Sequence, residues 1–578
     1  MPLVPLEIPP GVVRKATPLQ STGRYWDANL VRWRSGKLLP VGGWQRITAS
    51  ALASDVRGLF SWKANSGNTL TLIGCASQLY VLSGSTYTNI TPTGYTGEYV
   101  GSIGGYGAWE YGDLLYGDDT DPTYPRPESL QFFPSFSWTI DNWGGEVLAV
   151  ASSDGRLLHW KEGEAIAHEV GRAPIVTAVR SSNVVTIVTS YASEFYVGQE
   201  IAVIGVLDNT MDGTFVIDNV ISPTSFTYQS VGSNSSSSGG IVRTVPAVPT
   251  SNRAVVVTSE RYAVLFGAGG NPRRVAWSNQ EDYTNWDYAN TVTTSGFLDL
   301  DTTSEIIMAA PVREGTLIWT TDEVWLMRYV GLPYVYGIER IGYGCGLMAP
   351  KSFALTAGRC IWMGREGFWT YDGGVVKPLP CDVGSYVFDN IDRDSGALYS
   401  NGSDNGVFTE VWFWYPSSGQ SAPNRYVCYN YAEGWWSIGE MARTAAQPAG
   451  VYNFPMAAGT DRNLYFHEDG WTNAGTPITT ARYAETASIN VQSGGKISNV
   501  VQAITDSGYG FNSTRLTFFS EFTPEGTERT YGPYTPRSDG YTDTRVTGRD
   551  FRVKISSAAD ADWSIGEMRL EVRPTGDR

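Results

Sequence analysis

The feature that most constrains the fold is a short strand unit that returns along the chain from about residue 59 to residue 471. In each copy an apolar strand is followed by a polar turn, an aromatic-rich strand and a turn that contains glycine. The later copies recur every ~40–50 residues, the length of a four-stranded propeller blade and too long for a β-helix rung. Clear copies begin at Thr69, Leu148, Ala254, Gly315, Gly358, Asn424 and Phe454. We therefore predict an all-β fold built around a β-propeller of about six to eight blades.

Changes in composition divide the rest of the chain. Residues 174–250 hold no tryptophan and no lysine and alternate with a period of two, so we expect an inserted small β-barrel or sandwich. Residues 477–578 continue with alternating strands and a single tryptophan, which indicates a C-terminal β-sandwich. Residues 1–50 show little periodicity and are expected to form an extended arm. The propeller then comprises residues 51–173 and 251–476.

Tryptophans recur in most copies of the repeat. A single blade cannot cover both faces of its sheet, so we expect these side chains to pack between neighbouring blades. A tryptophan-lined carbohydrate cleft is the alternative. The six tryptophans concerned are Trp319, Trp325, Trp362, Trp369, Trp412 and Trp414.

The chain carries a net charge of −16, which argues against a protein that grips nucleic acid by its phosphates. The charge is uneven, because residues 1–47 contain seven basic and two acidic residues. A basic segment on an acidic body predicts docking onto an acidic partner, and the alternative is a solvated charged segment.

Compartment signals are few. The longest apolar runs have the length of strands and fall well short of the ~20 residues that span a bilayer, so no membrane span is expected. Prolines interrupt the apolar stretch at the N-terminus, and we expect no secretion signal. The five cysteines are scattered and match no metal motif, which favours reduced, buried thiols made in the cytosol.

No catalytic motif is found. The three histidines, His159, His168 and His467, stand in none of the familiar metal-ligand spacings. Nucleophile elbows, P-loops and dinucleotide fingerprints are likewise missing from the sequence. We therefore expect no catalytic residues, no cofactor and no metal site, and a protein that is not an enzyme.

Two short stretches still hold chemical possibilities. Residues 152–160, SSDGRLLHW, are similar to the Asp-box turn of sialidase-like propellers but place Asp154 one position early. We interpret them as a structural turn. The acidic stretch around Asp118, Asp119 and Asp121 offers oxygens to a cation such as calcium, against the alternative of a solvated turn. With 58 acidic residues, a glycosidase-type carboxylate pair also stays open.

The segment from Gly11 to Ile47 carries the most specific pattern of the chain. It resembles the opening of tail nozzle proteins of short-tailed phages, which are related to the packaged-DNA stabilisation family. The matching residues are Gly11, Arg14, Gly23, Trp26, Asp27, Val31, Arg32, Trp33, Gly36, Pro40, Gly42, Gly43 and Trp44. Residues 276–290 and 341–374 also look like that family.

The resemblance implies a structural virion protein of the phage tail, assembled in the host cytoplasm. Such a protein forms a ring, expected as a hexamer, that continues the channel of the portal and its adaptor. The ring retains packaged DNA and conducts it during ejection without binding it specifically, and tail fibres or spikes dock on its flank. We therefore expect channel-facing side chains to be mostly acidic or neutral.

The N-terminal segment takes a role in assembly under this hypothesis. An irregular basic arm would become ordered on the adaptor or on a neighbouring subunit, and its removal would leave a soluble propeller. The candidate assembly anchors are Arg14, Trp26, Arg32, Trp33 and Trp44.

Two other functions remain in competition. A phage receptor-binding or glycan-binding protein, including a depolymerase, would use tryptophans and propeller clefts equally well. A cellular propeller scaffold is the third hypothesis, although the WD dipeptide does not recur with the repeats and stands only at Trp26 and Trp286.

Overall fold

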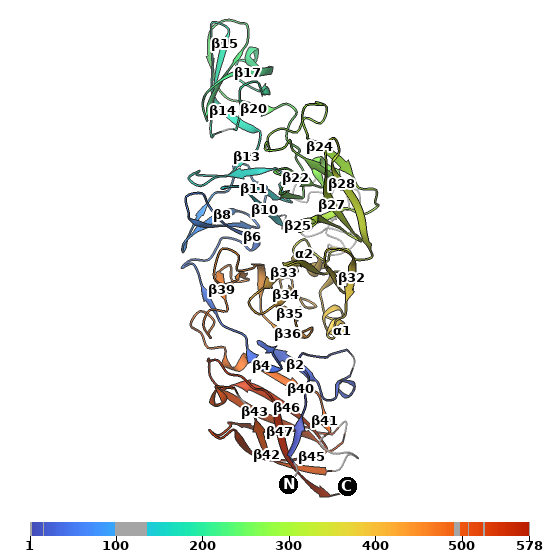
Figure 1. Ribbon diagram of the computed structural model, residues 1–578. Coiled ribbons are helices and arrows are strands. Elements are labelled where there is room, and N and C mark those ends of the chain that lie inside the picture. The colour runs from blue at the N-terminus through green and yellow to red at the C-terminus, as the bar shows by residue number, and fades with distance from the viewer. Residues whose placement is uncertain are drawn as a thin grey trace, which may run out of the picture.

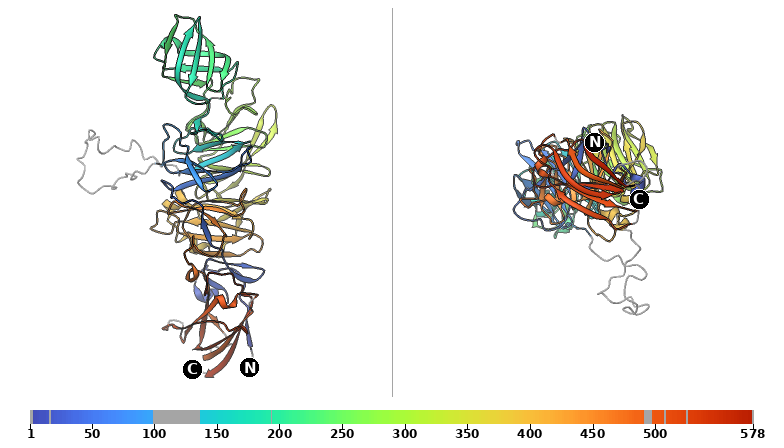
Figure 2. Two further views of the ribbon diagram at one scale, coloured as in Figure 1. Left: turned by 90° about the vertical axis from the view of Figure 1, so that its left-hand side faces the viewer. Right: turned by 90° about the horizontal axis from the view of Figure 1, so that it is seen from below.

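The computed structural model of the chain describes residues 3–15, 17–98, 136–192, 194–490, 497–506, 508–523 and 526–576. This part of the chain is nearly all β and forms three units along one long axis (Figure 1). A small barrel lies at one end, a propeller in the middle and a sandwich at the other end. A view turned by 90° has the same order (Figure 2). The first and last described strands both belong to the sandwich.

The propeller contains seven four-stranded antiparallel sheets within the described residues, in agreement with the predicted fold. One strand of each sheet faces a common central cavity, and the labelled inner strands meet around the middle of this unit (Figure 1). From the inner to the outer strand, blade 1 consists of β6 (Val56–Lys63), β7 (Thr69–Cys75), β8 (Leu79–Ser83) and β9 (Thr86–Asn89). Blade 2 consists of β10 (Trp138–Trp143), β11 (Glu146–Ala151), β12 (Leu158–Trp160) and β13 (His168–Glu169). Blade 3 consists of β21 (Ala254–Val257), β22 (Ala263–Phe266), β23 (Arg274–Trp277) and β24 (Gly296–Asp299).

The remaining four blades follow in chain order around the cavity. Blade 4 consists of β25 (Ile306–Val312), β26 (Gly315–Thr320), β27 (Glu323–Gly331) and β28 (Val335–Tyr343). Blade 5 consists of β29 (Phe353–Thr356), β30 (Arg359–Met363), β31 (Phe368–Tyr371) and β32 (Val376–Leu379). Two short helices, α1 (Gly384–Phe388) and α2 (Arg393–Tyr399), precede blade 6, which consists of β33 (Asn401–Asn405), β34 (Glu410–Tyr415), β35 (Arg425–Asn430) and β36 (Trp436–Glu440). Blade 7 consists of β37 (Arg443–Gln447), β38 (Met456–Gly459), β39 (Leu464–His467) and β5 (Trp44–Arg46).

Tryptophans pack between blades, as the repeat predicted. Trp319 of β26 and Trp362 of β30 belong to neighbouring blades, are fully buried and meet edge to face with ring centroids 5.8 Å apart. Trp412 and Trp414 of β34 lie in one cluster with Tyr465 of β39 in the next blade. Each buried indole removes ~150–250 Å² from water, so these rings supply a large share of the force that joins the blades.

Close approach between blades 1 and 2 depends on glycine. A Cβ atom built on Gly74 of β7 would stand 2.2 Å from Cγ of Trp138 in β10, far inside van der Waals contact. Trp138 itself is fully buried, and its Nε1–H donates to the carbonyl of Cys75 at 2.9 Å. The missing side chain at Gly74 therefore makes room for the ring that connects the two blades.

The inserted unit is a closed barrel between blades 2 and 3. Its ladder runs β15-β18-β17-β16-β20-β14 and closes where β14 pairs with β15, while β19 pairs with β14. Burial alternates in β15 and, on either side of a bulge between Ile175 and Thr177, in β14, so alternate side chains enter the barrel core. The strands are β14 (Arg172–Ser181), β15 (Val184–Thr189), β16 (Glu200–Ile204), β17 (Gly213–Ser222), β18 (Ser225–Gln229), β19 (Ser235–Ser237) and β20 (Ile241–Thr244).

The C-terminal unit is a sandwich of two sheets that share one core. One sheet has the order β1 (Leu3–Leu6), β47 (Met568–Gly576), β42 (Ile497–Thr505) and β45 (Tyr541–Gly548). The other has the order β2 (Tyr25–Asn29), β40 (Tyr483–Thr486), β46 (Asp550–Ser557), β43 (Thr514–Glu521) and β44 (Arg529–Tyr534), with β41 (Ile489–Asn490) paired to β46. The sandwich core continues into blades 5 and 6 through side chains such as Phe368 and Phe413.

The N-terminal segment differs from the extended arm expected for residues 1–50. β1 and β2 pair with strands of the sandwich, the hairpin β3 (Val31–Arg34) and β4 (Lys37–Pro40) follows, and β5 completes blade 7. The physical reason is ring closure: the last blade lacks an outer strand of its own and takes one from the start of the chain. The strands of this segment have only three to five residues each, too few to show a period.

Two further sequence expectations concern the cysteines and the membrane. All five cysteines are free thiols; Cys381 is half-buried and the other four are buried. Among the described residues, no helix has the length and apolar character needed to cross a lipid bilayer.

Candidate functional site

Three of the five predicted assembly anchors are buried inside the chain. Trp33 of β3 is 1% exposed and packs against Tyr25 and Trp435 at centroid distances of 5.0 and 5.5 Å. Trp44 of β5 stacks on His467 at 5.8 Å, and its Nε1–H donates to Asn473. These indoles hold the chain together and are not available to a partner in this structure.

Arg32, the third buried anchor, lies at the joint between the hairpin β3–β4 and blades 6 and 7. Its guanidinium pairs with Glu410 of β34 at 3.0 Å and with Glu468, and it lies 3.6 Å from the ring centroid of Phe408. Burial opposes the charge on Arg32, but the two carboxylates keep the pKa of Arg32 above its usual value. Burial raises the pKa of Glu410, and Arg32 counteracts part of that rise. The cluster is a buried electrostatic link, so Arg32 cannot serve as a surface anchor.

Arg14 and Trp26 are the two anchors that keep part of their surface exposed. The guanidinium of Arg14 lies over the rings of Tyr386 and Trp26, at 4.2 and 5.1 Å from their centroids, and pairs with Asp27 at 3.5 Å. The predicted basic arm is thus partly neutralised within the chain, since Lys15 also pairs with Asp382 at 2.7 Å. Of the five predicted anchors, these two alone remain open to another molecule.

The central cavity of the propeller has a volume of ≈ 350 Å³ and is lined by all seven inner strands. Most of its wall is apolar or neutral, and the exceptions include Asp141, Lys351 and Asp404. Burial raises the pKa of Asp141 to about 6, although the backbone N–H groups of Val257 and Asn142 oppose the rise. Burial lowers the pKa of Lys351 to about 8 and raises that of Asp404 to about 6. The cavity has the size of a small-molecule pocket and is far too narrow for a nucleic-acid duplex.

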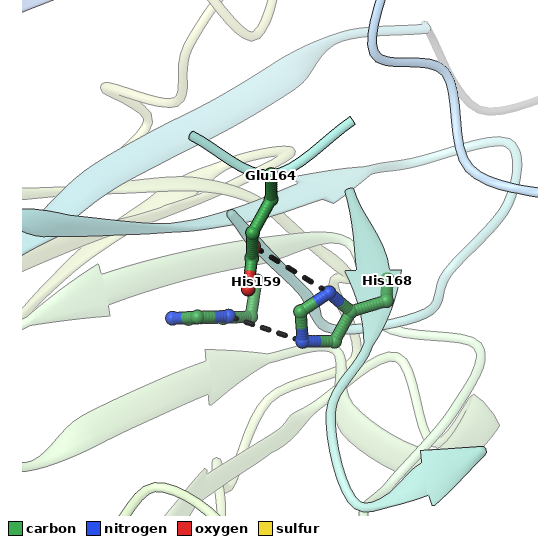
Figure 3. Close-up of side chains that lie close together, drawn as sticks. All are labelled: His159, Glu164 and His168. Atoms are coloured by element: carbon green, nitrogen blue, oxygen red, sulfur yellow. Dashed lines mark hydrogen bonds and ion pairs between the residues drawn. The ribbon is translucent and has the colours of Figure 1, made fainter. Parts of the chain in front are cut away.

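Three residues of types that bind metals, His159, Glu164 and His168, lie close together at the outer edge of blade 2 (Figure 3). His159 of β12 and His168 of β13 are opposite residues of the same ladder, and the intervening turn carries Glu164. Nδ1 of His159 stands 3.2 Å from Nε2 of His168, and Nδ1 of His168 stands 3.7 Å from the Glu164 carboxylate. One ligand atom from each of the three residues lies within 4.8 Å of the other two.

Neighbouring groups fix both imidazoles. Nε2 of His159 lies 2.9 Å from a carboxylate oxygen of Glu146, and the ring stacks on Tyr283. His168 stacks on Tyr191 of the barrel at 4.8 Å. Burial, and then the neighbouring imidazole of His159, lower the pKa of His168 to about 3.

The sequence alone gave no sign of this cluster. His159 and His168 are nine positions apart, which fits no helical or Cys-His motif. Their pairing depends on the hairpin: when residues 158–160 and 168–169 form adjacent strands, the two histidines face each other. A test of ligand types against the predicted strand pairing would have found them.

The other two stretches have different outcomes. In the Asp-box-like segment, Asp154 pairs with Arg156 at 2.7 Å, and Arg156 donates to the carbonyls of Thr93 and Gly94. These bonds connect a turn to a loop of blade 1, which fits a structural role. The acidic stretch with Asp118, Asp119 and Asp121 lies outside the described residues.

Comparisons with known proteins give similarity to solved structures alone. No family model matches the chain, and no curated protein matches it. The solved structures that resemble it include the WD40 domain of Pan2 from Neurospora crassa, with 8% identity, a TM-score of 0.28 and coverage of 61% of this chain and 93% of that one. YCF48 from Cyanidioschyzon merolae has 9% identity, a TM-score of 0.28 and coverage of 74% and 98%. A virginiamycin B lyase from Staphylococcus aureus has 8% identity, a TM-score of 0.26 and coverage of 72% and 96%. Similarities this low say nothing about function, and the propeller is assigned from its own seven sheets.

Proposed function

We propose that this chain is a structural, non-enzymatic subunit of a ring in the tail of a short-tailed bacteriophage, a tail nozzle. In this proposal the ring is a hexamer that assembles in the host cytoplasm and joins the adaptor below the portal. It retains the packaged DNA and conducts it during ejection.

The observation that carries the proposal is the place of the segment that resembles nozzle proteins. Residues 11–47 connect the propeller to the sandwich, because β2 enters the sandwich and β5 completes blade 7. Trp33, Trp44 and Arg32 belong to the matching pattern and are buried at this joint. The resemblance therefore concerns the residues that hold the two main units together, which favours a shared architecture over a chance likeness of a surface loop.

The conducting channel in this proposal lies between subunits. The cavity of each propeller, ≈ 350 Å³, has no room for a duplex, so the DNA passes along the axis of the ring. The net charge of −16 supports this arrangement, since acidic walls repel sliding phosphates instead of binding them. The partly exposed Arg14 and Trp26 remain the anchors proposed for the adaptor.

Exposed apolar side chains supply surfaces for a second copy of the chain. The tip of the long hairpin β27–β28 of blade 4 presents Val330, Leu332 and Tyr334, with exposed fractions of 57%, 68% and 78%. The barrel presents Leu207 and Val231, with 82% and 88%. Large apolar side chains gathered on a protruding hairpin are typical of contact surfaces, and we propose the hairpin as the contact between neighbouring subunits.

The test is the mass and symmetry of the purified full chain, by native mass spectrometry and electron-microscope class averages. We expect a six-fold ring with an open axis. The double variant Leu332→Asp with Tyr334→Asp should shift the population to monomers, because two charges would be buried in each contact. Val407→Asp is the matched control, since Val407 is also exposed, at 63%, but lies on blade 6.

Two outcomes would contradict the proposal. The first is a chain that stays monomeric at all concentrations, because a monomer cannot form the ring. A trimer or monomer that binds surface glycan would favour the alternative function, a receptor-binding or glycan-binding tail protein.

A further inference from the structure

The two buried histidines of blade 2 have the spacing of metal ligands. Zinc binds imidazole nitrogens at about 2.0–2.1 Å, and two such ligands at a tetrahedral angle stand ~3.3 Å apart. Nδ1 of His159 and Nε2 of His168 are 3.2 Å apart. The same distance also suits a hydrogen bond between the rings, so the residues around them must distinguish a metal site from a hydrogen-bonded pair.

The surroundings of His159 match the outer shell of a metal site. Metal-binding histidines almost always donate their second ring N–H to a carboxylate, carbonyl or water, which fixes the tautomer. Nε2 of His159 has such a partner in Glu146 at 2.9 Å, and Lys161 lies 3.5 Å from the other oxygen of the same carboxylate. With its proton held on Nε2, His159 directs the lone pair of Nδ1 toward His168.

A third ligand comes from the turn of the hairpin. Glu164 accepts the backbone N–H of Lys161 at 3.0 Å, which holds its carboxylate beside the imidazoles (Figure 3). Oε2 of Glu164 lies 3.7 Å from Nδ1 of His168, and one ligand atom of each of the three residues lies within 4.8 Å of the other two. A side-chain rotation of Glu164 that brings its carboxylate to the two nitrogens that face each other completes a three-ligand set. Two imidazoles and a carboxylate are a donor set that zinc favours, with a fourth position left to water. A cavity of ≈ 10 Å³ beside the rings, about the size of one water molecule, provides that position.

We propose that His159, Glu164 and His168 bind one divalent transition-metal ion, zinc by preference, at the joint between blade 2 and the barrel. The chain enters the barrel at Arg172, directly after β13. Tyr191 of the barrel stacks on His168, and Tyr283, which follows blade 3 strand β23, stacks on His159. An ion held by both imidazoles therefore restrains the barrel relative to the propeller. This inference is independent of the tail function.

The test uses the full chain without a histidine tag, because a tag would bind metal itself. After treatment with a chelator, Zn²⁺ is added and the bound ions are counted by native mass spectrometry, while Co²⁺ reports the ligand geometry by its visible absorption. We expect one ion per chain and the strong absorption of tetrahedral cobalt. Hydrogen exchange of residues 168–175 should slow when Zn²⁺ binds, which reports the restraint at the joint.

Substitutions distinguish the proposed ligands from the residues that only orient them. His168→Ala and Glu164→Gln should each lower the Zn²⁺ affinity by about 100-fold or more, and Glu146→Gln by ~10–100-fold. Glu162→Gln is the matched control: it removes a carboxylate from the same turn, but Glu162 bonds to Ser66 and Asn68 and should leave the affinity unchanged. Should His168→Ala fail to fold, Glu164→Gln still decides, because Glu164 is only half-buried.

Three results would overturn the proposal. The first is that the wild-type chain binds neither Zn²⁺ nor Co²⁺ at one ion per chain, which would leave the histidines as a hydrogen-bonded pair only. The second is that Glu162→Gln weakens binding as much as Glu164→Gln does. The third is that both ligand variants fold and keep the wild-type affinity.

Discussion

The variant Arg32→Met removes the charge at the joint between the propeller and the N-terminal hairpin while it keeps an apolar side chain of similar length. It leaves the carboxylates of Glu410 and Glu468 without their partner, and their side chains are only 1% and 11% exposed. Loss of one member of a buried ion pair costs about 3–5 kcal/mol. The guanidinium also contacts Phe408, and methionine replaces part of that packing. We therefore expect a loss near the lower end of this range and a fall in Tm of roughly 5 °C or more.

The loss should depend on pH in a defined direction. Burial already raises the pKa of Glu410, and without Arg32 that pKa rises further. A carboxyl group with a raised folded-state pKa contributes stability at low pH, and the contribution is lost as the pH rises through that pKa. At about pH 5 the Glu410 carboxyl of the variant is protonated and needs no cation, so the loss should be smallest there. The pKa of Glu410 is about 7 while Arg32 is present and lies higher without it, so the loss should grow as the pH rises to about 8.

Thermal unfolding followed by calorimetry at both pH values measures the effect. Arg34→Met is the control, because Arg34 follows in the same strand but is exposed. The double variant Arg32→Met with Glu410→Gln should regain part of the stability at about pH 8, since one of the unpaired charges is gone. The reasoning fails if Arg32→Met unfolds like Arg34→Met at about pH 8, or if its loss is the same at both pH values.

Two further predictions concern the same architecture. Deletion of residues 1–47 should yield aggregated or proteolysed chain, because it removes β5 from blade 7 and β1 and β2 from the sandwich; recovery of a monodisperse propeller by size-exclusion chromatography would contradict the joint described above. Trp362→Ala should lower the free energy of unfolding in urea by about 3–5 kcal/mol, because the indole is fully buried between blades 4 and 5 and donates to the carbonyl of Cys345. Trp26→Ala, at a half-exposed site, should cost less than half as much. Equal losses would refute a role for Trp362 in joining the blades.

The propeller was predictable because each blade repeats a local signal. Strands such as β26 and β30 carry apolar residues and tryptophan within a hairpin, so pattern and partner lie within ~20 residues of each other. The barrel was predictable for the same reason, since the alternation in β14 and β15 is visible without knowledge of the rest of the chain.

The N-terminal strands were not predictable from local pattern. β5 has only three residues, and it pairs with β39, which lies at the other end of the propeller sequence. The sequence of neither strand indicates this pairing. Arg32 and Trp33 look like surface anchors in a polar, glycine-rich segment, and only the fold brings the carboxylates and rings that bury them. The histidine cluster was predictable in part. Its hairpin is local in sequence, but the two histidines face each other only in the observed register of β12 and β13.

The joint between the propeller and the sandwich has a consequence for the order in which segments become buried during synthesis. Arg32 and Glu468 are 436 positions apart in the chain, and β1 pairs with β47, the last strand described. Ribosomes add ~5–20 residues per second, so the first 46 residues wait roughly 20 seconds to two minutes for their partners. During that interval β1, β2 and β5 have no strand to pair with, and the indoles of Trp33 and Trp44 lack Trp435 and His467, the late residues that they pack against. The apolar side chains and unpaired strands of the N-terminal segment are therefore exposed first during synthesis and buried last. A chaperone that bound this segment would act on the chain before the other segments are made.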